Sequence, residues 1–293
     1  MTKLKIRPYR AGDDPQQGIV PITVLILTRD EEKNIRQCLA SVAWADQVVV
    51  IDSGSTDDTV SIARSLGAEV VEQPWLGFSA QREFALRLPM IRHDWVQFVD
   101  ADQWVSPQLA QEIAALLRNA PTCAAYAHRF RVIFQGRWIR HCGWYDGSWN
   151  VQVMDRHRAK YDGSSVGERV CVDGDIRRLA NDIVDDDGKG LAAWLHKHVH
   201  YAQLEAARRS RPAPLLQRLH TLRQRNSARP FARALVKDIF YPWVPAKPVA
   251  LFCYMYFFRL GFLDGRPGLR FCFYHAWYEV SVAALRAYAP AAE

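Results

Sequence analysis

The sequence lacks the features that define several large classes of protein. Its six cysteines lie far apart, without the paired spacing of a metal or redox site or the density of a disulfide-stapled secreted domain. Its longest apolar run, residues 249–258, is shorter than the ~20 residues that span a bilayer. No internal repeat or low-complexity tract is present. We therefore expect a globular, cytoplasmic protein whose cysteines are reduced and mostly buried.

Two segments lack features that most of the chain has. Residues 1–18 hold no apolar stretch, so we expect a loose tail over residues 1–20 and no secretory leader. Residues 206–237 contain no acid at all. The basic residues of this acid-free stretch are Arg208, Arg209, Arg211, Arg218, Arg223, Arg225, Arg229, Arg233 and Lys237. Together with the formal net charge of +7, they favour an anionic partner.

Apolar runs and helical patterns alternate in the first part of the chain. The expected buried strands are residues 22–27, 47–51, 68–71 and 95–100. Apolar residues at helical spacing follow each of the four runs, and the pair Ser106-Pro107 predicts the start of the last of these helices. This alternation predicts an α/β fold with a mostly parallel sheet and helices on both of its faces.

The composition of the chain changes after residue 120 and again after residue 205. Residues 121–205 mix short strand-like pieces with Gly-rich turns and aromatic residues, and residues 206–293 are basic and aromatic with helical spacing. We therefore expect one domain over residues 21–205, with a first half over 21–120, and a helical appendage after it.

One predicted strand ends in two carboxylates separated by one small residue. The run that begins at Trp95 ends at Asp100, Ala101 and Asp102. Residues i and i+2 of a strand point the same way, so both acids can face one ligand. Two close carboxylates repel unless a cation lies between them, and Mg²⁺ binds one or two carboxylates together with phosphate oxygens. An isolated Asp-x-Asp is more often a solvated loop, so its neighbours decide its meaning.

Polar residues also follow the other strands of the predicted sheet. Thr28 and Arg29 follow the first strand, and Asp52 follows the second. Ligands of open α/β sheets bind at the carboxyl ends of the strands. We therefore expect these residues to converge with Asp100 and Asp102 on one crevice.

Two features of the second half of the chain, its aromatic residues and its basic stretch, each allow two interpretations. Its aromatic residues, Trp138, Trp144, Tyr145 and Trp149, suit either a core or a platform on which a sugar stacks. The acidic turn 185–187 is interpreted as a charge complement for the helix that follows it. The basic stretch, beside the aromatic segments 249–258 and 269–288, indicates either an interfacial membrane anchor or a contact with a twin subunit. No recognition module supports nucleic-acid binding.

At this point four motifs resemble a known family. Residues 24–35, 38–42, 50–59 and 98–102 resemble glycosyltransferase family 2. The resemblance implies a GT-A fold, which is Rossmann-like, and inverting transfer from a nucleotide-sugar donor, most often a UDP-sugar. Residues 258–265, with Gly268, resemble the lipopolysaccharide-core β-glucosyltransferases, which work at the cytoplasmic face of the bacterial inner membrane. The partners implied are a lipid-linked or lipopolysaccharide acceptor and an anionic membrane surface.

The resemblance also assigns roles to individual residues. Asp52 would accept from the imide N–H of the base, and Arg82 would approach the diphosphate. Asp102, with Asp100 beside it, would ligate Mg²⁺ or Mn²⁺. Glu168 would act as the general base. The nucleotide-binding set implied in full is Thr28, Arg29, Glu31, Asp52, Ser55, Arg82, Asp100 and Ala101.

The chain departs from the family pattern at several positions. Glu83 replaces a common Asn, Gln103 a common Glu, and Gly167 a usual His. Asp185 and Gly188 also interrupt a segment that in relatives often carries His and Arg. The first half keeps its main acids and the departures gather in the acceptor half, so a polyprenyl-phosphate glycosyltransferase and a non-catalytic nucleotide-sugar-binding module stay open as alternatives. The sugar, the base and the oligomeric state are also left open.

Overall fold

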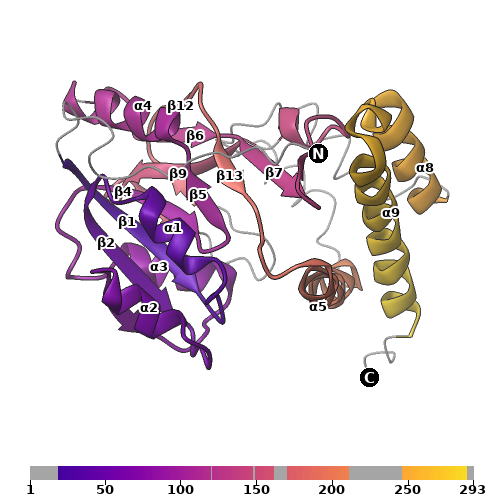
Figure 1. The fold of residues 1–293 in the computed structure, drawn as a ribbon, viewed down its shortest axis with the longest axis horizontal. Coiled ribbons are helices and arrows are strands. Elements are labelled where there is room, and N and C mark those ends of the chain that lie inside the picture. The colour runs from indigo at the N-terminus through magenta and orange to yellow at the C-terminus, as the bar shows by residue number, and fades with distance from the viewer. Residues whose placement is uncertain (1–18, 120, 148, 162–169, 211–245, 289–293) are drawn as a thin grey trace. The chain divides into compact units, whose positions relative to one another are not determined.

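The computed structural model describes residues 19–119, 121–147, 149–161, 170–210 and 246–288 (Figure 1). The chain forms two compact units. Unit 1 comprises Met1–Val132 and Ser148–Gly188, and unit 2 comprises Ile133–Gly147 and Lys189–Glu293. The division that the sequence suggests at residue 205 stays a prediction about domains.

A seven-stranded sheet forms the centre of unit 1. Its strands run in the order β12-β6-β9-β4-β1-β2-β3. Their bounds are β1 Val20–Thr28, β2 Ala45–Asp52, β3 Glu69–Glu72, β4 Trp95–Asp100, β6 Ala125–His128, β9 Asn150–Asp155 and β12 Ile176–Arg178. The pairs among β4, β1, β2 and β3 are parallel, as is the pair of β12 with β6. β9 is antiparallel to both of its neighbours, so the sheet is mixed with a parallel majority.

Four helices of unit 1 connect or follow these strands: α1 Ile35–Ser41, α2 Thr59–Ser65, α3 Phe78–Leu86 and α4 Pro107–Arg118. Alternate residues of β1 enter two separate cores. Val24 and Ile26 pack with residues of α1, α2 and α4, whereas Leu25 packs with residues of α3. This alternation follows from the two-residue period of a strand. The expected α/β fold, with helices on both faces of the sheet, is confirmed.

The predicted start of α4 is also confirmed. Ser106 precedes Pro107, which is the first helical residue, and the Ser106 hydroxyl accepts from the Leu109 N–H at 3.2 Å. This pattern satisfies one of the free N–H groups at the start of the helix.

Smaller strand groups complete unit 1. β5 Gln103–Val105 pairs with β13 Ile183–Asp185, which pairs in turn with residues 130–132 of β7 Phe130–Phe134. β10 Ala159–Tyr161 and β11 Val170–Val172 form an antiparallel pair. The β5–β13 pairing has a functional consequence, because β5 follows directly on Asp102.

Unit 2 is helical, as the sequence predicts for the C-terminal region. Its elements are β8 Arg137–Trp138, η1 Tyr145–Gly147, α5 Leu191–Ser210, α8 Lys247–Cys253, the π-helix η4 Tyr254–Phe258, η5 Gly261–Asp264 and α9 Gly265–Ala287. β8 pairs with the end of β7, and the Phe134 ring contacts Trp194 of α5 and Phe271 of α9. Ala202, Ala206 and Val282 form a small buried cluster between α5 and α9.

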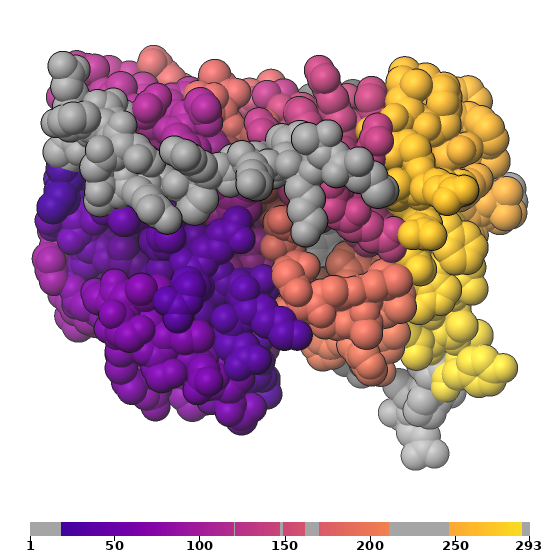
Figure 2. Space-filling view, in the orientation of Figure 1, coloured from indigo at the N-terminus to yellow at the C-terminus, as the bar shows by residue number. Residues whose placement is uncertain are grey.

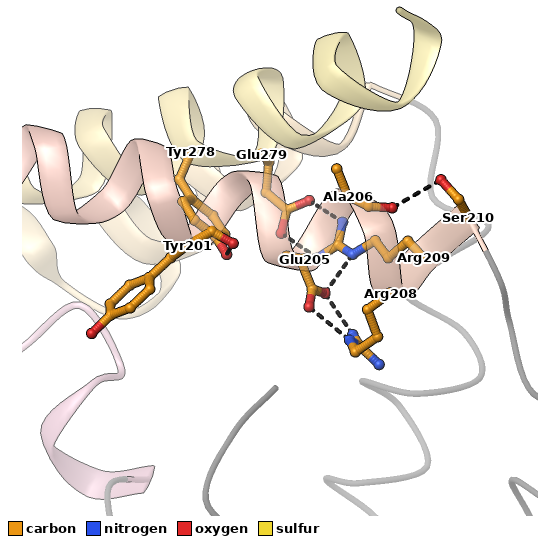
Figure 3. Close-up of polar contacts among 8 residues, drawn as sticks. All are labelled: Tyr201, Glu205, Ala206, Arg208, Arg209, Ser210, Tyr278 and Glu279. Carbon is orange, nitrogen blue, oxygen red and sulfur yellow. Dashed lines mark hydrogen bonds and ion pairs between the residues drawn. The ribbon is translucent and has the colours of Figure 1, made fainter. Parts of the chain in front are cut away.

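A charged network also joins α5 to α9 (Figure 3). Arg209 donates from Nη1 to Glu279 at 2.7 Å and from Nε to Glu205 at 2.6 Å. Arg208 makes two further bonds to Glu205. Burial opposes the charge of Glu205, but its hydrogen bonds with Arg208 and Arg209 lower its pKa. These two arginines of the basic stretch are therefore engaged in packing helices, and the stretch from residue 211 lies outside the described residues.

Two expectations, about membrane-spanning helices and about the cysteines, can be compared with the structure. No helix within the described ranges is both long and apolar enough to cross a bilayer. All six cysteines are free thiols, and Cys38, Cys123, Cys142 and Cys272 are buried. The expectation of mostly buried thiols is therefore confirmed.

Candidate active site

The register of the central strands brings three strand ends together in unit 1. Thr28, at the end of β1, is paired with Asp52 at the end of β2. On the other side of β1, Leu27 is paired with Asp100 at the end of β4. Because all three strands are parallel, the polar residues that follow them lie at one edge of the sheet.

Asp52 organises the turn that follows β2. The carboxylate is 2% exposed and accepts from the Thr28 hydroxyl at 3.0 Å. It also accepts from the N–H groups of Gly54 and Ser55, at 3.0 and 2.8 Å, and from the Ser55 hydroxyl. A carboxylate accepts about four hydrogen bonds, so this turn uses that capacity. The predicted contact of Asp52 with a base would replace one of these bonds.

The turns after β1 and β2 brace each other. Asp30, whose φ of +52° lies in the left-handed region, accepts from the Thr56 N–H at 2.8 Å. The Glu31 N–H donates to the Thr59 hydroxyl at 2.7 Å, and the Glu32 N–H donates to Asp57 at 3.1 Å. These bonds fix the two turns as one rigid rim, with Arg29 exposed on it.

Asp100 is held by two side chains. Its Oδ1 accepts from Arg82 Nη2 at 2.7 Å, and its Oδ2 accepts from the Gln103 amide at 3.3 Å. Gln103 also accepts from the Asp100 N–H, so it closes the turn of the Asp-x-Asp motif. The Arg82 side chain is 3% exposed and lies over the Phe98 ring at 5.1 Å. Arg82 therefore orients Asp100, and its predicted approach to a diphosphate stays a prediction.

Asp102 lies beside the acidic turn that follows β13. The Asp186 N–H donates to the Asp102 carbonyl at 3.0 Å, next to the pairing of Asp185 with Gln103. The first turn of α5 contains no acid. The backbone pairing of β13 brings these acids to the Asp-x-Asp motif, and their role as a charge complement for α5 stays a prediction.

Asn34 ties this acidic turn to the turn after β1. Its amide donates to Glu31 at 2.8 Å and to Asp187 at 3.1 Å, and its carbonyl oxygen accepts from the Gly188 N–H at 2.8 Å. Two acids from distant parts of the chain thus meet at one buried amide. Partial burial, together with the charge of Asp187, raises the pKa of Asp186.

The thiol of Cys38 provides further evidence that the acids gather here. Cys38 is on α1, and its Sγ lies 3.7 Å from the Asp100 carbonyl oxygen. Burial raises the pKa of this thiol, and the nearby charges of Asp102, Asp100 and Glu31 raise it further. Acidic side chains therefore gather at the carboxyl edge of the sheet, which favours a cation or a cationic group there.

The site can hold a divalent cation only with help from a ligand. Among the described residues, no three His, Cys, Asp or Glu side chains are arranged to hold a metal ion. The oxygens of Asp100 are engaged by Arg82 and Gln103, and Asp102 is half-buried. One carboxylate suffices for Mg²⁺ when diphosphate oxygens supply further ligands, so the residues fit such an ion.

The remaining predicted residues are distributed as follows. Ser55 lies in the Asp52 turn, and Ala101 is buried at 3% exposure. Glu168 lies outside the described residues, so its role as general base stays a prediction. Trp149 stacks on Arg129 and Arg178 in unit 1, whereas Trp138 packs edge-on against Tyr145 in unit 2. The four aromatic residues therefore do not form one cluster within a unit.

Three amide side chains of the site were given no role in the sequence analysis. Asn34 and Gln103 act as described above, and Gln81, which is fully buried, donates to Ser53 at 3.1 Å. Gln81 also accepts from the Leu76 N–H at 3.2 Å, so it links α3 to the turns after β2 and β3. In the sequence, each of the three is marked only by being an amide residue within or next to a motif.

Parts of this chain are similar in sequence to glycosyltransferases. An uncharacterised glycosyltransferase of Rickettsia typhi is 39% identical over 118 residues, which cover 39% of this chain and 40% of that protein. The lipopolysaccharide core biosynthesis glycosyltransferase LpsC of Rhizobium meliloti is 28% identical over 103 residues, 33% of this chain and 37% of that protein. The chain thus matches well under half the length of these relatives.

Among solved structures, glucosyl-3-phosphoglycerate synthase from Mycobacterium tuberculosis is 26% identical, with a TM-score of 0.32. That match covers 38% of this chain and 44% of the synthase, which was crystallised with Mn²⁺, UDP and its product.

A family model gives the broadest match. The model described as glycosyl transferase family 2 matches residues 23–172, which is about half of the chain and includes most of unit 1. Its span contains the Asp52 turn, the Asp-x-Asp motif and Arg82. The chain therefore belongs to glycosyl transferase family 2.

Proposed function

We propose that this protein transfers a sugar from a UDP-sugar to the hydroxyl of a lipid-linked glycan, with inversion at the anomeric carbon. The observation that carries the proposal is the meeting of Thr28, Asp52 and Asp100 at one edge of a parallel sheet. A rigid, acid-rich rim at that edge supports the binding of a nucleotide diphosphate together with a cation.

The reaction is a direct displacement. The acceptor oxygen forms a bond to the anomeric carbon while the bond from that carbon to the diphosphate oxygen breaks. The acceptor proton passes to a carboxylate, for which Glu168 is our candidate. The nucleoside diphosphate leaves with the electron pair of the broken bond.

The chain's own residues prepare this step electrostatically. Asp102 would hold Mg²⁺ or Mn²⁺ with the donor diphosphate, and such an ion neutralises charge on the leaving group. Arg82 and Gln103 fix the Asp100 carboxylate, so the motif does not have to reorganise when the donor binds. The bonded turns after β1 and β2 keep the donor-binding rim in place.

Two resemblances support the choice of acceptor. The Rhizobium meliloti relative is a lipopolysaccharide core biosynthesis glycosyltransferase, and the closing motif of this chain resembles enzymes of that pathway. We therefore infer a lipopolysaccharide-core acceptor at the cytoplasmic face of an inner membrane, with the protein bound peripherally. A polyprenyl-phosphate acceptor is the alternative, and it needs no general base because a phosphate is already ionised.

A donor screen tests the proposal. Thermal unfolding is followed with UDP-, GDP- and ADP-sugars, with and without Mn²⁺, because a ligand of the native state raises its stability. We expect a UDP-sugar to raise the unfolding temperature in the presence of Mn²⁺. Asp102→Asn should lose this response, whereas the matched surface variant Asp94→Asn, at a carboxylate whose side chain is 78% exposed, should keep it.

Transfer assays then separate the alternatives. Competition between a lipid-linked core acceptor and polyprenyl phosphate should favour the former. Glu168→Gln should lower the turnover number far more than donor affinity; a change confined to donor affinity would remove Glu168 as the base. Nucleotide binding without transfer or hydrolysis would support a non-catalytic binding module.

A further inference from the structure

Exposed apolar side chains of the described residues concentrate in one part of unit 2. Seventeen large hydrophobic residues are exposed, and eleven of them lie between residues 249 and 288. The most exposed adjacent pair is Phe257 and Phe258, at 55% and 79%. Contiguous exposed apolar surface of this kind marks an interaction site more often than scattered single residues do.

Five of these residues lie in the short turn from η4 to η5. They are Phe257, Phe258, Leu260, Phe262 and Leu263. The turn is fixed from below: the Arg259 carbonyl accepts from the Cys142 N–H at 3.0 Å, and the Leu263 N–H donates to the Leu260 carbonyl at 2.9 Å. Leu260 has a φ of +58°, a costly conformation for a leucine.

The backbone beneath the turn is closely packed. A Cβ on Gly261 would lie 2.8 Å from the Met255 carbonyl oxygen, and a Cβ on Gly268 would lie 2.4 Å from the Gly261 carbonyl oxygen. Asp264, 2% exposed, accepts from the His141 N–H at 2.8 Å. The fold therefore holds the apolar side chains outward on a rigid support, and their exposure does not come from a frayed end.

One face of α9 continues this surface. Arg266, Leu269, Arg270, Phe273 and Val280 are exposed, and their spacing puts them on one side of a helix with 3.6 residues per turn. Phe271, Cys272 and Val282 are buried on the other side. In the space-filling view, α8 and α9 are coloured orange to yellow (Figure 2).

The charges that residues 247–288 themselves present to solvent have one sign. Residues 247–288 contain five basic residues and two acids. Both acids are buried and paired, Asp264 with His141 and Glu279 with Arg209. Arg259 pairs with Asp146, and Arg270 bonds to the neutral amide of Gln135. The solvent-facing groups of the segment itself are therefore apolar or cationic.

We propose that the turn 257–263 and the adjoining face of α9, here called the aromatic face, dock on the surface of a bilayer that contains anionic lipids. Aromatic side chains sit well at the headgroup level, and each nearby basic residue adds attraction to anionic lipid. A second copy of the chain fits less well, because a two-fold contact would bring the cations of both faces together.

The inference rests on the proposed function only in its choice of a lipid as partner. It narrows the predicted anchor, which combined the basic stretch with the aromatic segments beside it, to the aromatic face. Arg208 and Arg209 of the basic stretch are bonded to glutamates, and its other basic residues lie outside the described residues. Vesicle binding requires no sugar transfer, so failure of one idea is distinguishable from failure of the other.

The test is cosedimentation of the full chain with sucrose-loaded vesicles. The vesicles contain phosphatidylcholine with about one-third phosphatidylglycerol, or phosphatidylcholine alone. We expect binding to the anionic vesicles that weakens at high salt. The double variant Phe257→Ser/Phe258→Ser should bind at least about tenfold more weakly, since a tenfold change is only about 1.4 kcal/mol. Phe257→Leu/Phe258→Leu should keep most of the binding.

Matched controls separate docking from general hydrophobicity. Leu66→Ser/Val199→Ser removes two exposed apolar side chains outside the aromatic face, at 46% and 40% exposure, and should bind as the unaltered protein does. Circular dichroism should show the same fold for every variant. Equal sedimentation of the Phe257→Ser/Phe258→Ser variant would overturn the proposal. So would a dimer in size-exclusion chromatography that this variant converts to monomer, because the aromatic face would then bind a second copy.

Discussion

Removal of the Asp52 carboxylate tests how the nucleotide half of the site is built. Asp52 is 2% exposed and accepts four hydrogen bonds, two from backbone N–H groups and two from hydroxyls. Asp52→Ala leaves all four donors without this acceptor. At about 1 kcal/mol net for each bond, the free energy of unfolding should fall by about 4 kcal/mol.

Two milder variants separate the contributions of charge and of single hydrogen bonds to that cost. In Asp52→Asn, the remaining carbonyl oxygen still accepts from Gly54 and Ser55, while the amide donates to hydroxyls that rotate to accept. The count of bonds is kept and the charge is lost, so we expect a cost of about 1–2 kcal/mol. Thr28→Val removes one hydroxyl donor and should cost about 1 kcal/mol.

Urea unfolding followed by tryptophan fluorescence measures these costs. Asp58→Ala is the matched control, because Asp58 is exposed in the same turn, and it should change the stability by less than about 0.5 kcal/mol. If Asp52→Ala cost no more than Asp58→Ala, Asp52 would not organise the turn. Its carboxylate would then be available to a base, as the family resemblance implies.

Three further variants test other parts of the structure. Arg82→Met should lower the free energy of unfolding by about 2 kcal/mol, because it removes the buried cation that pairs with Asp100, whose side chain is 35% exposed. Arg64→Met, at an exposed pair, should lower it by less than about 1 kcal/mol. Equal costs would contradict the role of Arg82. Burial lowers the pKa of His128 to about 4, so the stability it contributes is complete above pH ~6.5 and is lost as the pH falls toward 4, by up to about 3 kcal/mol. His128→Phe should flatten this part of the stability profile in urea unfolding at stepped pH, and an unchanged slope would count against it. Gly268→Ala should cost about 2–3 kcal/mol in thermal unfolding, since its Cβ would lie 2.4 Å from the Gly261 carbonyl oxygen; a normal melting temperature would show that this junction yields.

Local patterns predicted the central strands and the start of α4 well, because each depends on neighbouring residues. The alternation of β1 residues and the Ser106-Pro107 pair are readable within a few positions. The insertion of β9 between β4 and β6 had no such signal, since its place is set by pairing between distant segments.

The same distinction applies to the site. The carboxyl edge was predicted from strand ends, and the register confirms that Asp52 and Asp100 flank β1 there. The bond between Asn34 and Gly188 joins residues 154 positions apart, so no local pattern reported it. Asp52 shows a second difficulty for sequence-based prediction. Its carboxylate, which was expected to bind a base, is the hydrogen-bond acceptor that its own turn requires.

The most direct test of the central claim is calorimetric titration of a UDP-sugar into the full chain with Mn²⁺ present. We predict saturable binding to the unaltered protein and at least about tenfold weaker binding to Asp102→Asn, with Asp94→Asn binding normally. Equal affinity of Asp102→Asn and the unaltered protein would contradict the account, because the acid-rich edge of the sheet would then take no part in holding the donor.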